Sequence, residues 1–142
     1  MIQISSSRGD QLQIELLEEV EMAQASGDIR LSVSVRSGQF QGQIIVWVAK
    51  ETAVSFSRVA MSLNETLQGC AVLESISPDE LHIEVLAASP RGYLTIRGSL
   101  GCRVLGEEQR QWHKHGIVFG FEFEPSQLDA LVREPWVAKN AA

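Results

Sequence analysis

The sequence has few of the residues that several large classes of protein require. Only two of its 142 residues are cysteine, which is too few for a disulfide framework. The longest apolar run, residues 44–49, is far shorter than the roughly 20 residues that a membrane-spanning helix needs. The first ten residues lack the basic and apolar segments of a secretory signal. We therefore expect a cytoplasmic protein that folds without disulfides or membrane helices.

Basic residues are also scarce. Lysine and arginine number 12 against 18 acidic residues, so the net charge is −6, which disfavours a nucleic-acid-binding protein. The segment from Asp10 to Asp28 holds six acidic residues and no basic one. Such a run is either a solvated face or a surface that attracts a basic partner, since a field of one sign accelerates association.

The motifs of common enzymes are missing. The sequence contains no G-x-S-x-G turn, Walker loop, dinucleotide fingerprint or C-x-x-C pair. His113 and His115 would share one face of a strand, and Glu107 or Glu108 could add a third zinc ligand, but solvated residues at a strand start explain the same pattern. We predict no catalytic residue, no metal and no cofactor, and hence a protein that is not an enzyme.

An amphipathic helix is the clearest element that is present. Between Glu51 and Val72 the apolar residues recur at three- and four-residue steps, and Gly69 then favours a left-handed helix end. The stripe of this helix consists of Ala53, Phe56, Val59, Ala60, Leu63 and Leu67.

Alternating apolar residues predict strands before this helix. Residues 11–16 form the first, and residues 29–36 and 39–48 form a hairpin around Ser37-Gly38, after a turn at residues 25–28. The end of the second hairpin strand is apolar on both faces, so it needs cover from two sides. This favours Trp47 in the core; an exposed Trp47 would instead be a good interface anchor.

The chain after the helix predicts a meander of short strands. Turns at Pro78-Asp79 and at residues 89–92 separate strands that begin near Ala71, Leu81 and Tyr93, and the last strand covers residues 116–123. A short helix begins at Pro125 and stops at Pro135, and the tail after about residue 136 is expected to be disordered. Cys70 and Cys102 have apolar neighbours at strand positions, so each is expected to act as a small hydrophobic residue.

The predicted fold is thus a single α+β domain over residues 1–142. It has one antiparallel β-sheet of about six to seven strands, a central amphipathic helix packed on that sheet and a short C-terminal helix.

A set of apolar and glycine positions, with one glutamine, follows the pattern of a known family. These positions are Phe56, Leu63, Leu67, the step Gly69-Cys70-Ala71-Val72-Leu73, Leu81, Ile83, Val85, Gly92, Gly98, Phe121, Phe123, Gln127 and Leu128. Together they resemble the WapI-family immunity proteins of bacterial polymorphic toxin systems. The resemblance extends from about residue 29 to residue 131, although Ser126 stands where an acidic residue is usual and residues 101–116 have no clear counterpart.

The resemblance implies a non-enzymatic protein that binds and neutralises a cognate protein toxin, which could be basic. The residues that we expect to bind the toxin are Glu15, Glu18, Glu19, Glu21 and Trp47. Two alternatives remain open: a small-ligand-binding module with a pocket between helix and sheet, lined by Trp47, Trp112 and His82, and a homo-oligomeric protein of another role. The sequence is compatible with a monomer or a homodimer.

Overall fold

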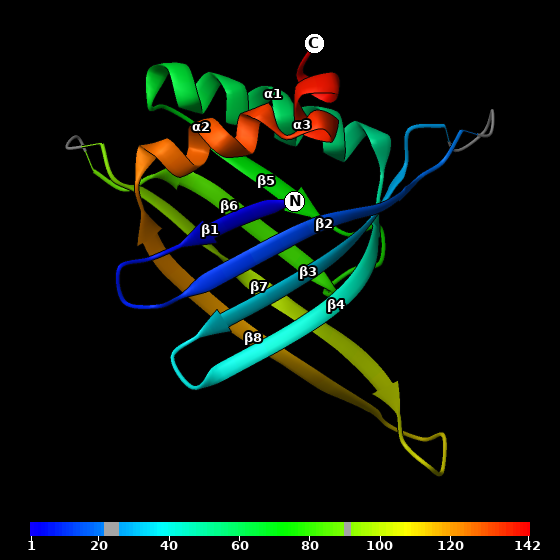
Figure 1. Ribbon diagram of the computed structural model, residues 1–142. Helices are drawn as coiled ribbons and strands as arrows, with labels where there is room; N and C mark the ends of the chain where they lie inside the picture. Colours follow the sequence, from blue (N-terminus) through cyan, green and yellow to red (C-terminus); the bar gives the residue numbers. More distant parts are fainter. Residues whose placement is uncertain (22–25, 90–91) are drawn as a thin grey trace.

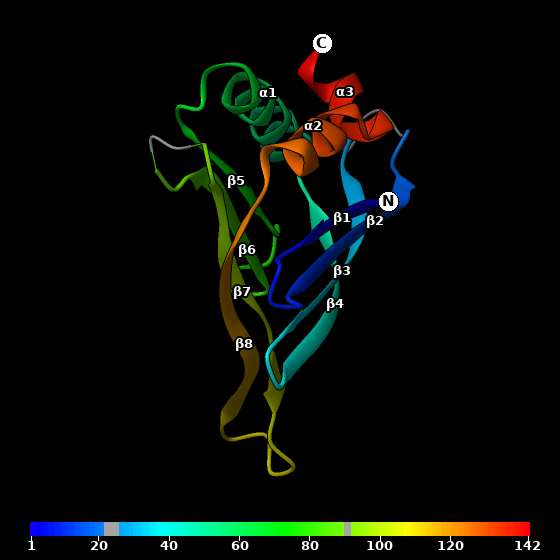
Figure 2. The ribbon, with the colours of Figure 1, turned by 60° about the vertical axis from the view of Figure 1, so that its left-hand side comes forward.

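The computed structural model describes residues 1–21, 26–89 and 92–142. Within these residues, two four-stranded antiparallel sheets face each other and three helices cover one end of the space between them (Figures 1 and 2). Sheet A contains β1 (Ile2–Ser5), β2 (Gln11–Glu19), β3 (Ile29–Ser37) and β4 (Phe40–Val48). Sheet B contains β5 (Cys70–Glu74), β6 (Leu81–Ala87), β7 (Leu94–Leu105) and β8 (Trp112–Phe123). Helix α1 (Lys50–Thr66) joins the sheets, and α2 (Pro125–Arg133) and α3 (Pro135–Ala141) follow sheet B.

The prediction of a single sheet of six to seven strands is wrong, although the α+β class is confirmed. Each sheet is a meander in chain order, because its strands are joined by turns too short for a parallel crossover. Each sheet has one apolar face. In sheet A this face consists of aliphatic side chains, and in sheet B aliphatic side chains of β5, β6 and β7 are joined by phenylalanines of β8. Two such faces bury each other, which a single sheet with one helix does not achieve.

The sheets converge at one end and diverge at the other (Figure 2). Where they converge, β4 contacts β7 and β8, and a Cβ atom placed on Gly42 would lie 3.1 Å from Cγ2 of Ile117. Where they diverge, α1 fills the wedge with Phe56 and Leu63, and the ring of Phe56 stacks on Trp136 of α3 at a centroid distance of 6.1 Å. Glycine at position 42 therefore permits this close approach of the two sheets.

Helix α1 confirms most of the predicted stripe. Ala53, Phe56, Ala60 and Leu63 are buried. The helix ends earlier than predicted, because Leu67 takes the left-handed conformation (φ 57°) and its N–H donates to the carbonyl of Leu63. The side chain of Leu67 is consequently 39% exposed and leaves the stripe.

The C-terminal tail is a helix rather than a disordered segment. Pro135 ends α2 but also occupies the first turn of α3, where its missing N–H leaves no hydrogen bond unmade. Trp136 and Val137 are buried against α1. The apolar pair Trp136-Val137, just after the proline, is the sequence signal that indicates this helix.

The two ends of the chain are joined through α2 and the residue that follows it. The terminal ammonium of Met1 forms an ion pair with Glu134 at 3.0 Å. The side-chain amide of Gln127 accepts a hydrogen bond from the N–H of Ser5 at 2.7 Å and donates one to its carbonyl at 2.8 Å. Gln127 thus satisfies backbone groups of β1, the short outer strand of sheet A.

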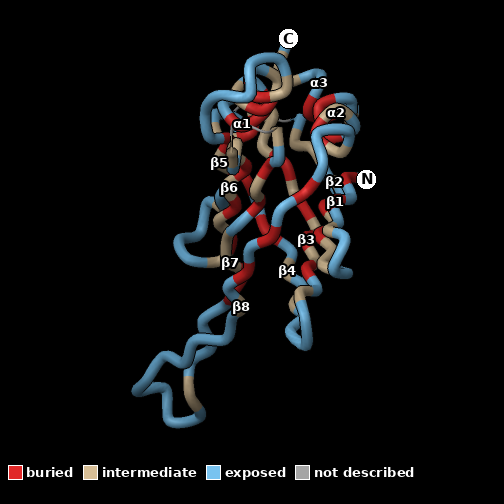
Figure 3. The backbone as a smooth tube through the Cα atoms, turned by 90° about the vertical axis from the view of Figure 1, so that its left-hand side faces the viewer, coloured by how far each residue is buried: buried red, intermediate tan, exposed pale blue. Residues whose placement is uncertain are grey.

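Strand β7 continues past Gly98 and runs to Leu105. Its last residues pair with Trp112–His115 and form, with the turn between them, a two-stranded projection beyond the sandwich. We call residues 102–115 the β7–β8 arm; Figure 3 shows that it is almost entirely exposed. The arm lies within residues 101–116, the segment without a clear counterpart in the family that the sequence resembles.

Two predicted turns lie partly outside the described residues: position 25 of the turn at 25–28, and positions 90 and 91 of the turn at 89–92. The other predicted turns, at Ser37-Gly38 and at Pro78-Asp79, connect neighbouring strands as expected. In the described part of the chain, no helix is both long and apolar enough to cross a membrane.

We predict that Gly98→Ala destabilises the protein by about 3 kcal/mol or more. A Cβ atom at this position would overlap the backbone carbonyl oxygen of His82 on β6, so a strand must move. Gly120→Ala is the matched control, because its Cβ would lie 3.4 Å from Cβ of Arg97, an ordinary contact. Urea unfolding at equal protein concentration should separate the two variants, and similar midpoints would contradict the prediction.

Candidate functional site

The candidate site lies on the face of sheet A that points away from sheet B. We call this surface the outer face of sheet A. The strand registers place its side chains in rows across β2, β3 and β4. Near the helices one row contains Glu18, Arg30 and Trp47, and the next contains Glu15, Ser32 and Ile45.

A bulge in β2 decides which acidic residues reach this face. The register shifts between Leu16 and Glu18, so Glu18 lies opposite Arg30 and Glu19 lies opposite the buried Ile29. A bulge inserts one residue and reverses the alternation after it. Glu15 and Glu18 consequently share the outer face, and Glu19 turns to the other side.

Three of the six acidic residues between Asp10 and Asp28 bond to other parts of the chain and stabilise the fold, so they do not form a free acidic surface. Glu19 forms an ion pair with Lys139 of α3 at 2.7 Å. Asp28 accepts a hydrogen bond from the N–H of Lys50 at 2.9 Å, and so satisfies one of the free N–H groups at the start of α1. Asp10 accepts hydrogen bonds from the hydroxyls of Ser6 and Ser37, each at 2.7 Å.

The remaining acidic residues, Glu15, Glu18 and Glu21, are exposed. Glu18 is 4.0 Å from Arg30, an exposed pair that contributes little to stability. Arg30 was not among the predicted site residues, although it reduces the net charge of this surface. The strict alternation of residues 29–36 already placed it on the polar side of its strand, and only the pairing of β2 with β3 brings it beside Glu18.

Trp47 is on the surface, which overturns the preference for a core position. Its side chain is 37% exposed, and Ile45 on the same strand is 50% exposed. The carbonyl of Trp47 accepts a hydrogen bond from the N–H of Ile76, which ties this end of β4 to the loop after β5. We call Glu15, Glu18, Arg30, Ile45 and Trp47 the acidic–aromatic patch.

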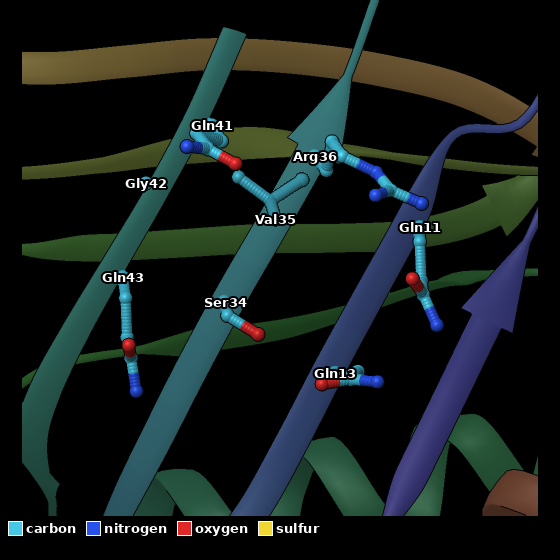
Figure 4. A pocket seen from close by; sticks show the side chains of 8 residues that line it. All are labelled: Gln11, Gln13, Ser34, Val35, Arg36, Gln41, Gly42 and Gln43. Carbon is cyan, nitrogen blue, oxygen red and sulfur yellow. The ribbon is translucent and has the colours of Figure 1, made fainter.

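The other half of the outer face is polar and nearly uncharged (Figure 4). The side chains of Gln11 and Gln13 on β2 and of Gln43 on β4 lie on either side of Ser34 on β3. They line a shallow groove with Arg36 at its end. Amides present both donors and acceptors, so this half can border a protein interface without a charge preference.

The pocket expected between helix and sheet is not formed by its predicted lining. Trp47 lies on the outer face of sheet A, His82 lies on the outer face of sheet B, and Trp112 lies in the β7–β8 arm, in the last strand pair before its turn. The space between α1 and the sheets is occupied by buried side chains, including Phe56, Leu63 and Trp136.

His82 belongs to a charged network on the outer face of sheet B. Its ring nitrogens lie 3.3 Å from Glu74 and 3.6 Å from Glu84. Arg97 donates a hydrogen bond to Glu84 at 2.8 Å, and this bond is the main cause of the lowered pKa of the Glu84 carboxyl, with His82 adding to it. Among the residues that the structure describes, no group of three or more His, Cys, Asp and Glu side chains could hold a metal ion, His113 and His115 included.

Both cysteines are exposed, which corrects the expectation that they act as small hydrophobic residues. They occupy outer strand positions, and alternation alone does not show which face of a strand is buried. Local desolvation raises the pKa of the Cys70 thiol, and the Glu84 carboxylate adds to the rise. Cys70 is therefore protonated and weakly nucleophilic at neutral pH.

Comparisons with protein-family models, with curated proteins and with solved structures give no match to this chain. The resemblance to immunity proteins therefore stays a prediction, and any function must be inferred from the residues of the candidate site.

We predict that Asp10→Asn destabilises the protein at pH 7 by about 1 kcal/mol. The hydroxyl groups of Ser6 and Ser37 lower the pKa of the Asp10 carboxyl below its ordinary 3.8, so the charged form stabilises the fold above that value. This stabilisation is lost as the pH falls through the lowered pKa. Urea midpoints of both proteins should differ at pH 7 and converge near pH 2; an equal difference at both pH values would contradict this assignment.

Proposed function

We propose that this protein is a non-enzymatic, cytoplasmic immunity protein that binds and neutralises a cognate protein toxin through the acidic–aromatic patch. The single observation that carries the proposal is the exposure of Trp47 beside Ile45, Glu15 and Glu18 on one sheet face. Tryptophan is enriched at binding hot spots, where a large ring is desolvated inside a polar rim.

The patch is held rigidly, which favours binding without rearrangement. β3 pairs along its whole length with β2 and β4, and the end of β4 is tied to the loop at Ile76. A preformed face loses little conformational entropy on binding. Trp47 is thus positioned before the partner arrives.

The charge of the protein supports a basic partner. The net charge is −6, and Glu15, Glu18 and Glu21 are the exposed part of the acidic run. Complementary charge accelerates the association of this protein with a basic protein. Arg30, at the centre of the patch, favours those partners that place an acidic or polar group opposite it.

The experiment tests binding to the toxin domain encoded beside the gene for this chain. We expect co-expression to yield a complex and to rescue growth, and Trp47→Ala to weaken the complex by about 2 kcal/mol, roughly 30-fold in Kd. Gln43→Ala, on the same strand and the same face, is the control and should change Kd less than about threefold. Circular dichroism and urea unfolding establish that both variants are folded.

A second variant separates charge from contact. Glu15→Lys with Glu18→Lys should lower the association rate, by more at low salt than at high salt, because screening weakens the attraction. Glu107→Lys with Glu108→Lys, in the β7–β8 arm, is the charge-matched control. No complex with the neighbouring toxin domain, or full protection by the Trp47→Ala protein with unchanged Kd, would refute the proposal.

A further inference from the structure

Strand β8 forms a long, uncovered edge of sheet B. It has 12 residues, contains no proline, and pairs with β7 without any register shift. The other edges are shorter or partly covered: β1 has four residues and Gln127 bonds to it, β5 has five residues, and the loop at Ile76 bonds to the end of β4. A long flat edge offers unpaired backbone donors and acceptors to another strand.

The side chains of β8 are self-complementary about Val118. On the outer face of sheet B the strand presents Lys114, Gly116, Val118, Gly120 and Glu122 in that order. Reversing the strand exchanges the basic with the acidic residue and one glycine with the other, and leaves Val118 in place. Val118 is also 86% exposed, the largest exposed fraction among the large hydrophobic residues of the described chain.

We propose that two copies of this chain associate through antiparallel pairing of β8 with β8, with a two-fold axis at Val118, to form one eight-stranded sheet. In this arrangement Lys114 lies opposite Glu122 of the partner subunit, and the same pair recurs on the other side of the axis. Gly116 lies opposite Gly120 of the partner subunit, and the two Val118 side chains meet at the axis. The interface is isologous, as two-fold symmetry requires.

Neighbouring registers lack this complementarity. Opposed residues must share a face, so the axis moves in steps of one residue and the partner of each residue shifts by two. An axis at Ile117 places Lys114 opposite Gly120 and Glu122 opposite Trp112 of the partner subunit. An axis at Phe119 places Glu122 opposite Gly116, and it places Lys114 opposite Glu124, which lies beyond the strand end. Only the axis at Val118 pairs both charges within the strand.

The β7–β8 arm gains support in such a dimer. Alone, the arm is a two-stranded ribbon with solvent on both faces, and Trp112 in the last strand pair before its turn is 65% exposed. An isolated two-stranded ribbon is marginal in water. In the proposed register His115, at the base of the arm, lies opposite Phe121 of the partner subunit, so a third strand supports that base. Trp112, next to the turn, lies opposite Glu124 of the partner subunit, just beyond the end of its β8.

A groove borders the C-terminal part of the β8 edge. The turn at Ser6–Asp10 is the part of sheet A that faces Gly120–Glu122, and an open groove separates the two. The acidic–aromatic patch is on the other sheet, so dimerisation leaves it free. The proposed dimer therefore does not depend on the toxin-binding proposal.

The first test is sedimentation velocity of the full chain from about 1 µM to about 1 mM. We expect a shift from the 15.7 kDa monomer to a species of twice that mass. Lys114→Glu and Glu122→Lys should each raise the dimer dissociation constant about tenfold, since each places like charges opposite each other twice. The double variant restores the pairs and should return the constant to within about threefold of wild type. A monomer at all concentrations, or a double variant weaker than both single variants, overturns the proposal.

The second test fixes the register. In a Cys70→Ser, Cys102→Ser protein, Val118→Cys should form an intermolecular disulfide with oxidised glutathione, because directly opposed Cα atoms lie about 4.5–5.5 Å apart. Ser99→Cys is the matched control, since Ser99 lies opposite Val118 on β7 and its two copies would be about 14 Å apart. Cross-linking of the Ser99 variant but not the Val118 variant overturns the proposed axis.

Discussion

The fold depends on burying two apolar sheet faces that are in contact at only one end. At that end the close approach at Gly42 brings β4 against Ile117 of β8. At the other end the sheets are too far apart to pack on each other, and α1 and α3 fill the gap, with Phe56 stacked on Trp136. The sandwich is a wedge with a helical plug, so the connecting helix is a component of the core rather than a cover for one sheet.

The local periodicity of the sequence predicted most elements of this fold. The alternation of Ile29, Leu31 and Val33, and the helical spacing of Phe56 and Leu63, correspond to buried faces in the structure. The number of sheets could not be obtained in this way, because strand period does not show which strands pair. The short β1 and the helix after Pro135 were missed because four to seven residues give too little periodicity to recognise.

The candidate site shows the same limit at the level of single residues. Glu15, Glu18 and Trp47 share a face as a binding surface would require, but Glu19 belongs to an ion pair with Lys139 that is 120 residues away in sequence. The β2 bulge lies between Leu16 and Glu18, so Glu18 rather than Glu19 joins Glu15 on the outer face, and no residue in the sequence predicts this shift. The sequence shows where acidic residues are concentrated. Only the pairing register of the strands shows which of their carboxylates are exposed and which form ion pairs within the fold.

The link between Ser5 and Gln127 constrains how the chain can reach its native state. These residues are 122 positions apart, and the ammonium of Met1 contacts Glu134 over a separation of 133. During synthesis on a ribosome, the outer edge of β1 gains its hydrogen bonds to Gln127 only after α2 emerges. By contrast, β2, β3 and β4 can pair as soon as they emerge. Synthesis therefore produces a partly formed first sheet that stays open to misassociation until the final helices emerge.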